Sequence, residues 1–151
     1  MSEHLVLVSH GRFCEELKKS AEMIMGPQET ISTVALLPEE GEADFLEKFE
    51  AITESLEDFV VFADLLGGTP CNILSKKIMQ GASFDLYTGM NLPMVISYVN
   101  ASLLAIEGDY VKESAESIVK VNELLLNVAV DDEEIAILIF REKRIINYPV
   151  I

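Results

Sequence analysis

The side chains best suited to chemistry are one histidine and one aspartate, each placed just after a strand-like apolar run. The run at residues 5–8 stops shortly before His10, and the run at residues 59–63 stops at Asp64. In an open parallel α/β sheet, ligands bind at the edge formed by the carboxyl ends of the strands. A carboxylate that accepts a hydrogen bond from one imidazole nitrogen fixes the tautomer and leaves the other nitrogen as a nucleophile. We therefore predict that His10 and Asp64 meet at this edge as a catalytic pair.

A glycine turn after the aspartate predicts a place for an anion. Gly67 and Gly68 permit a tight turn and a close backbone approach to a phosphate. Thr69 is a favourable N-cap residue, and Pro70 suits the first helical position. A helix that begins there directs unsatisfied N–H groups and its positive dipole end at the site. Alone, this pattern indicates only a helix start, and the aspartate only a turn cap; together with the histidine, they favour phosphoryl chemistry.

Five further residues are weaker candidates at the same edge. Ser9 could donate a hydrogen bond to a bound phosphate, although serine is commonplace at a strand end. Gly11 follows the histidine, and Asn72 lies in the first turn of the expected helix, where it could brace the loop. Gly89 and Asn91 follow the fourth expected strand, so that they either line the pocket or only turn the chain.

The order of elements predicts a doubly wound α/β fold with a mostly parallel sheet in strand order 2-1-3-4. In that order the first and third strands are neighbours, which would bring the histidine and the aspartate together. Periodicity and turn residues predict strands over residues 4–9, 30–36, 59–63 and 84–88, and helices over residues 13–25, 43–56, 70–80, 92–106 and 109–118.

The last part of the chain is harder to interpret. Residues 119–125 fit either a helix or a final strand. After an acidic break at residues 131–134, the β-rich runs 135–140 and 145–151 suggest a hairpin, or edge strands given to a partner subunit. We expect one domain over residues 1–130 and a short β-rich extension over residues 131–151.

Composition narrows the class of protein. Eleven Lys and Arg against 26 Asp and Glu give a formal net charge of −15. This charge disfavours binding to nucleic acid and favours binding to basic protein partners. Alternatively, it serves only to keep the protein soluble. No apolar run reaches the ~18 residues of a membrane span, and no basic leader precedes the first strand. Cys14 and Cys71 are expected to be reduced and packed, and no spacing indicates a metal site. These features predict a cytoplasmic protein.

From the first strand to about Leu125, the chain resembles the IIA domain of the mannose-type sugar phosphotransferase system. The resemblance rests on Val8-Ser9-His10-Gly11, on Asp64 with Gly67-Gly68-Thr69-Pro70 and Asn72, and on Gly89-Met90-Asn91-Leu92-Pro93.

The resemblance implies a phosphotransferase component that needs no cofactor. His10 would take a phosphoryl group from the histidine-containing carrier protein HPr and pass it to a IIB component. Asp64 would orient the ring so that Nε2 is phosphorylated, and backbone amides around Leu65 and Thr69 would hold the phosphate. The protein would reach the membrane only through the IIC and IID components. Family members are homodimers that exchange a fifth, antiparallel carboxyl-terminal strand, which looks like residues 119–125 here.

Three other functions fit parts of the pattern. A phosphocarrier subunit for dihydroxyacetone kinase shares the fold and the histidine, but the Gly-Gly-Thr-Pro turn speaks against it. A small tetrapyrrole metal chelatase would need further metal-facing histidines. A regulatory or dimerisation module would use His10 and Asp64 only as a buried polar pair. The sequence does not select the transported sugar or sugar acid.

Overall fold

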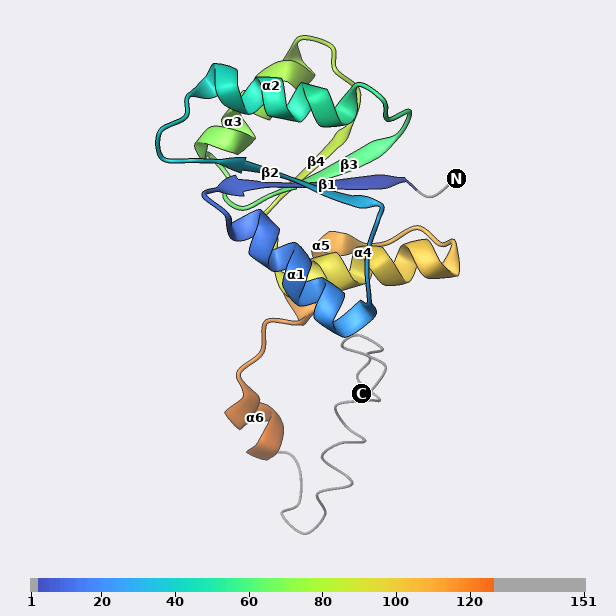
Figure 1. Ribbon diagram of the computed structural model, residues 1–151. Helices are drawn as coiled ribbons and strands as arrows, with labels where there is room; N and C mark the ends of the chain where they lie inside the picture. Colours follow the sequence, from blue (N-terminus) through green and yellow to red (C-terminus); the bar gives the residue numbers. More distant parts are fainter. Residues whose placement is uncertain (1–2, 127–151) are drawn as a thin grey trace.

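Four parallel strands form one sheet in the order β2-β1-β3-β4 (Figure 1). The computed structural model describes residues 3–126. The strands are β1 (His4–His10), β2 (Ile31–Leu36), β3 (Phe59–Ala63) and β4 (Asp85–Thr88). The strand order and the α/β class predicted from the sequence are confirmed. Because the order reverses between β1 and β3, the chain leaves these two strands toward opposite faces of the sheet, and in such sheets ligands bind outside the carboxyl ends at this point.

Helices cover both faces of the sheet. On one face lie α1 (Phe13–Met25), α4 (Leu92–Leu104) and the short α5 (Tyr110–Glu116), and on the other lie α2 (Glu42–Thr53) and α3 (Thr69–Met79) (Figure 1). A last helix, α6 (Val121–Leu126), lies apart from the sheet (Figure 1).

Strand β1 is buried on both faces, which explains its continuous apolar run. Successive side chains of a strand point to opposite faces. Accordingly, Leu5 and Leu7 join the core under α1 and α4, whereas Val6 and Val8 join the core under α2 and α3. All four side chains have no exposed surface. The two cores hold β1 in place, and with it the histidine at its end.

The core beneath α2 and α3 is organised around Phe49. Its ring centroid lies 6.5 Å from that of Phe45, 6.1 Å from that of Phe59 and 5.8 Å from that of Phe84. Phe49 is 1% exposed. It therefore joins α2 to β3 and to the segment that leads into β4.

The structure corrects the prediction for the end of the domain. Residues 119–125 fit either a helix or the fifth strand that the family resemblance implies, and in the structure Val121–Leu126 is the helix α6. The run of leucines favours a helix when no neighbouring strand supplies a hydrogen-bonding ladder. The exchange of a strand between subunits is not seen in this single chain. The predicted extension at residues 131–151 lies outside the described residues, as does its boundary at residue 130.

We expect Phe49→Ala to destabilise the fold by about 3–5 kcal/mol, because it removes the shared ring of the aromatic core and leaves a cavity. Denaturant unfolding monitored by circular dichroism would measure the loss. Met23→Ala serves as the control, because Met23 is 80% exposed on α1 and its truncation should change stability by less than about 0.5 kcal/mol. Equal effects of the two substitutions would contradict this description of the core.

Candidate functional site

His10 and Asp64 meet at the carboxyl edge of the sheet. The imidazole Nδ1 of His10 lies 2.8 Å from Oδ2 of Asp64, and the backbone N–H of His10 donates to the same oxygen at 2.9 Å. The two residues are 54 positions apart in sequence and are brought together because β1 and β3 are neighbours. No hydrogen bond with another described residue involves Nε2. Nδ1 is thus held by the carboxylate, and Nε2 is the nitrogen left for chemistry.

The environments of the two side chains differ. The imidazole is 46% exposed, whereas the carboxylate is 14% exposed. Both hydrogen bonds go to Oδ2, and Oδ1 of Asp64 is buried without a partner among the described residues. A buried carboxylate oxygen that lacks a donor is costly unless a nearby group compensates its charge. It therefore favours any positive charge that develops on the adjacent ring.

The turn after Asp64 is built around the histidine ring. A Cβ atom placed on Gly68 would lie 2.6 Å from Cε1 of His10, so that only glycine leaves room for the ring in this position. Gly67 adopts φ +78°, and the N–H of Gly68 donates to the carbonyl of Leu65 at 3.1 Å. The structure corrects one expectation here: Gly68, not Thr69, is the N-cap residue of α3, and Thr69 is its first helical residue. The close approach of the ring explains the glycine at that cap.

The start of α3 is open to an anion. The N–H groups of Leu65 and Thr69 make no hydrogen bond with another described residue. The first turn of α3 has no acidic side chain. Asn72 braces the turn, because its Nδ2 donates to the carbonyl of Gly67 at 2.9 Å. Free N–H groups at the positive end of a helix, beside a reactive nitrogen, suit a phosphate.

Two residues that flank His10 have structural contacts. Ser9 is fully buried; its hydroxyl donates to the carbonyl of Gly11 at 3.0 Å and accepts the N–H of Cys14 at 2.8 Å. The hydroxyl of Ser9 thus caps the first turn of α1. Gly11 has φ +55° and donates its N–H to Leu36 at 2.7 Å, so it turns the chain from β1 into α1.

The loop after β4 is held at the same edge of the sheet, but it makes no hydrogen bond to His10. Met90, between Gly89 and Asn91, donates its N–H to the carbonyl of Ala63 at 3.1 Å. Asn91 caps α4: its Oδ1 accepts the N–H of Met94 at 3.0 Å, and its Nδ2 donates to Ser114 at 2.6 Å. Gly89 has φ +77° and turns the chain out of β4. The observed contacts of Asn91 position α4 and α5.

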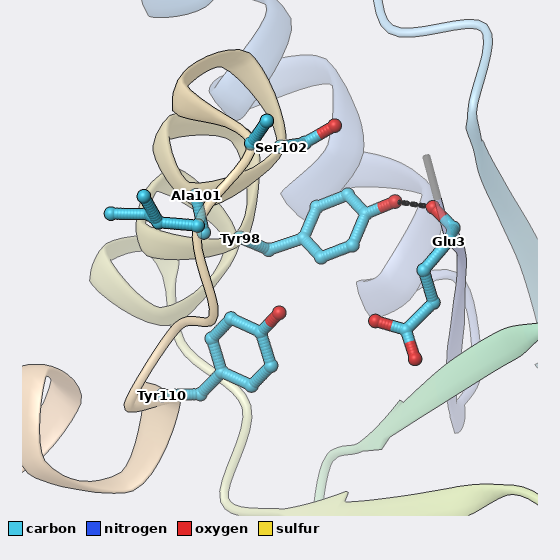
Figure 2. Close-up of a pocket in the computed structure, with 7 residues that line it drawn as sticks. Glu3, Tyr98, Ala101, Ser102 and Tyr110 are labelled. Atoms are coloured by element: carbon cyan, nitrogen blue, oxygen red, sulfur yellow. Dashed lines mark hydrogen bonds between the residues drawn. The ribbon is translucent and has the colours of Figure 1, made fainter. Parts of the chain in front are cut away.

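A separate pocket, which no sequence pattern indicated, lies at the far end of α4. Its volume is about 400 Å³, and its lining includes Glu3, Tyr98 and Tyr110. The hydroxyl of Tyr98 donates to the backbone carbonyl of Glu3, and both tyrosine rings lie near the Glu3 carboxylate (Figure 2). A Cβ atom on Gly108 would lie 2.3 Å from the Tyr110 ring, so that glycine allows the ring to fold inward.

Electrostatics in this pocket oppose negative charge. Burial, and then the nearby Glu3 carboxylate, raise the pKa of Tyr110 to about 12. Burial, and then Asp58 and Asp85, raise the pKa of Glu3. The aromatic cluster of Phe62, Tyr98 and Tyr110 packs against the sheet here, with the Phe62 and Tyr110 ring centroids 5.3 Å apart. The pocket therefore belongs to the hydrophobic support of the sheet, away from His10.

The described part of the chain contains neither a cluster of metal-binding side chains nor a membrane-spanning helix. Within residues 3–126, no three His, Cys, Asp or Glu side chains are grouped so as to hold a metal ion. In the same residues, none of the helices is long and apolar enough to cross a membrane.

Comparison with known proteins places this fold and site in a family. The family model described as "PTS system fructose IIA component" matches residues 4–119. The match covers well over half of the 151 residues and includes both His10 and the turn that contacts it. The chain belongs to this family, the mannose-type IIA components of the sugar phosphotransferase system.

Individual relatives agree with the family. The chain is 29% identical over 104 residues to the "PTS system mannose-specific EIIAB component" of Escherichia coli strain K12, a match that covers 67% of this chain and 32% of that protein. The chain thus spans about a third of the length of that relative. It is 27% identical over 105 residues to the "PTS system sorbose-specific EIIA component" of Lacticaseibacillus casei, covering 68% of this chain and 76% of that one.

Solved structures share the fold. The "Mannose/sorbose specific IIA subunit of phosphotransferase system" from Enterococcus faecalis superimposes with a TM-score of 0.68 at 28% sequence identity, covering 80% of this chain and 95% of that chain. The phosphotransferase system component EIIA from Streptococcus agalactiae gives a TM-score of 0.70 at 25% identity, covering 80% and 98%.

We expect Gly68→Ala to displace the His10 ring without unfolding the chain. Gly68 has φ −71° and ψ 161°, which alanine adopts freely, so the contact with the ring is the main obstacle. The Nδ1–H proton of His10, held by Asp64, should lose its distinct NMR signal, and reactions at His10 should slow on the order of 10²-fold.

The control for this substitution is Gly41→Ala. A Cβ atom on Gly41 would lie 3.8 Å from the nearest atom, an ordinary contact. An unchanged His10 signal in Gly68→Ala would contradict the steric argument.

We expect Tyr110 to contribute to alkaline unfolding. In the unfolded chain its pKa returns to its ordinary value of 10.0, below the folded value of about 12. The contribution of Tyr110 to stability is therefore complete below pH 10 and is lost as the pH rises through about 12. Absorbance of tyrosinate should rise later with pH in the folded chain than in urea, and Tyr110→Phe should unfold at higher pH. A folded chain whose tyrosines all ionise near pH 10 would refute this.

Proposed function

We propose that this chain is a phosphocarrier, which accepts a phosphoryl group from phospho-HPr on Nε2 of His10 and passes it to a IIB component for sugar uptake. The observation that carries the proposal is the hydrogen bond of 2.8 Å between Nδ1 of His10 and Asp64, which leaves Nε2 available on a ring that contacts Gly68, the cap of α3. Membership of the IIA family supports the same role.

The transfer step follows from this geometry. The lone pair of Nε2 attacks phosphorus, and the bond between phosphorus and the donor's histidine nitrogen breaks. As the ring gains positive charge, Asp64 stabilises it through the Nδ1–H group. The N–H groups of Leu65 and Thr69, together with the dipole of α3, would receive the phosphoryl oxygens. Transfer to the acceptor repeats the step in reverse, so positioning and charge stabilisation are the main tasks of the protein.

The proposal also includes the partner proteins, the cellular compartment and the oligomeric state of the chain. The net charge of −15 favours basic donor and acceptor proteins. We place the protein in the cytoplasm, in contact with the membrane only through the IIC and IID components. We also propose a homodimer, because apolar side chains of α5 and of the segment from Ser117 to α6 are exposed, among them Val111 at 63% and Ile118 at 78%.

The test is phosphorylation with phosphoenolpyruvate, enzyme I and HPr, read by intact mass. The wild-type chain should gain one acid-labile phosphoryl group of about 80 Da, and His10→Ala should gain none. Asp64→Asn should slow the transfer on the order of 10²–10⁴-fold, because it removes the charge that supports the ring.

Two matched controls are available within the chain. His4→Ala removes the other histidine, at the opposite end of β1, and Asp58→Asn changes an exposed aspartate just before β3. Both should accept the phosphoryl group as the wild type does. An adduct on His10→Ala would refute the assignment. No adduct on the wild type, under conditions that label another IIA protein, would favour a regulatory or dimerisation module.

A further inference from the structure

The leucine pair Leu65–Leu66 follows Asp64 directly, and both side chains are exposed to solvent. Leu65 is 60% exposed and Leu66 is 77% exposed, whereas Asp64 beside them is 14% exposed. Two large adjacent apolar side chains that remain in water next to a reactive group mark a contact surface. They contribute little to the stability of the folded chain without a partner, since most of their surface stays hydrated.

The turn that carries the leucine pair is already ordered. The N–H of Gly68 donates to Leu65, the side chain of Asn72 donates to Gly67, and the N–H of Asn72 donates to Gly68, with distances from 2.9 to 3.1 Å. The backbone on which the leucines stand is therefore held by three hydrogen bonds. A surface that is ordered before binding loses little conformational entropy when a partner covers it.

The leucine pair lies where a phosphoryl donor must make contact. The Cβ of Leu65 and Cε1 of His10 both lie within 3.4 Å of the position that a Cβ on Gly68 would occupy. Direct transfer requires the reacting atoms to approach to ~3–3.5 Å. A protein whose phosphohistidine reaches Nε2 of His10 must therefore also contact the turn that carries Leu65 and Leu66.

The charges around this edge define the partner further. Glu15 and Glu16 lie in the first turn of α1, just after His10, and Glu42 begins α2. Each of these carboxylates is ion-paired, Glu15 with Arg12, Glu16 with Lys19 and Glu42 with Lys76. The edge thus combines an apolar centre with a charged periphery, on a chain whose net charge of −15 is complementary to an apolar patch with a basic rim.

We propose that Leu65 and Leu66 form the apolar docking surface for the phosphohistidine-bearing donor protein, which presents an apolar patch with basic residues around its histidine. This inference rests on the proposed phosphocarrier function and assigns recognition of the protein donor to side chains that take no part in the chemistry.

The experiment compares a protein donor with a small one. Phosphoramidate can phosphorylate a histidine directly: its P–N bond breaks, the bond from Nε2 to phosphorus forms, and ammonia leaves. Leu66→Ala should raise the KM for phospho-HPr about tenfold, the effect of losing a buried leucine contact, and should leave the rate with phosphoramidate at the wild-type value. Leu65→Ala should raise the KM for phospho-HPr similarly.

Met79→Ala provides the matched control, because Met79 is an apolar side chain, 87% exposed, at the opposite end of α3. It should change neither reaction. An unchanged KM for phospho-HPr in both leucine variants would overturn the docking surface while the phosphocarrier function stands. Equal slowing with both donors would also overturn it, because the leucine would then act by positioning His10. A wild-type chain that accepts phosphate from neither donor would instead refute the proposed function.

Discussion

One carboxylate oxygen, Oδ2 of Asp64, accepts hydrogen bonds from both the backbone N–H and the ring Nδ1 of His10. The double contact fixes the imidazole relative to its own backbone and turns Nε2 away from the aspartate. It depends on the parallel register of β1 and β3, whose last paired residues are Val8 and Ala63. A shift of one residue in either strand would carry the aspartate to the other face of the sheet. The buried cores on both faces of β1 therefore serve the site by fixing this register.

The position of the ring then constrains the turn that follows Asp64. The ring occupies the space of a side chain at Gly68, and this glycine becomes the cap of α3. Because the ring contacts this cap, the open N–H group of Thr69 follows directly after the residue that touches the ring. The same turn raises Leu65 and Leu66 into solvent, where a partner protein would meet them. The proposed chemistry and the proposed recognition of the donor would thus both depend on a single short segment.

The residues at the two edges of the sheet make different kinds of contact. At the carboxyl edge, hydrogen bonds of Ser9, Asn72 and Asn91 satisfy helix starts and turns and leave the His10 ring half exposed. At the other end of α4, Tyr98 and Tyr110 pack with Phe62 and enclose a pocket beside Glu3 (Figure 2). Burial there raises the pKa of both tyrosines above their ordinary value. The aromatic pocket and the candidate site therefore lie at opposite ends of the same layers of strands and helices.

The sequence by itself determined the strand order and the edge of the sheet at which His10 and Asp64 meet. Apolar runs, helical periodicity and glycine turns act over a few residues, and the rules for parallel sheets connect them. The tertiary structure alone decided the cap at Gly68 in place of Thr69, the use of Ser9 as a cap for α1, and the aromatic pocket around Tyr110. It also placed a helix at Val121–Leu126, where short apolar segments suit either a helix or a strand. These features depend on contacts between residues far apart in the chain, which no local pattern records.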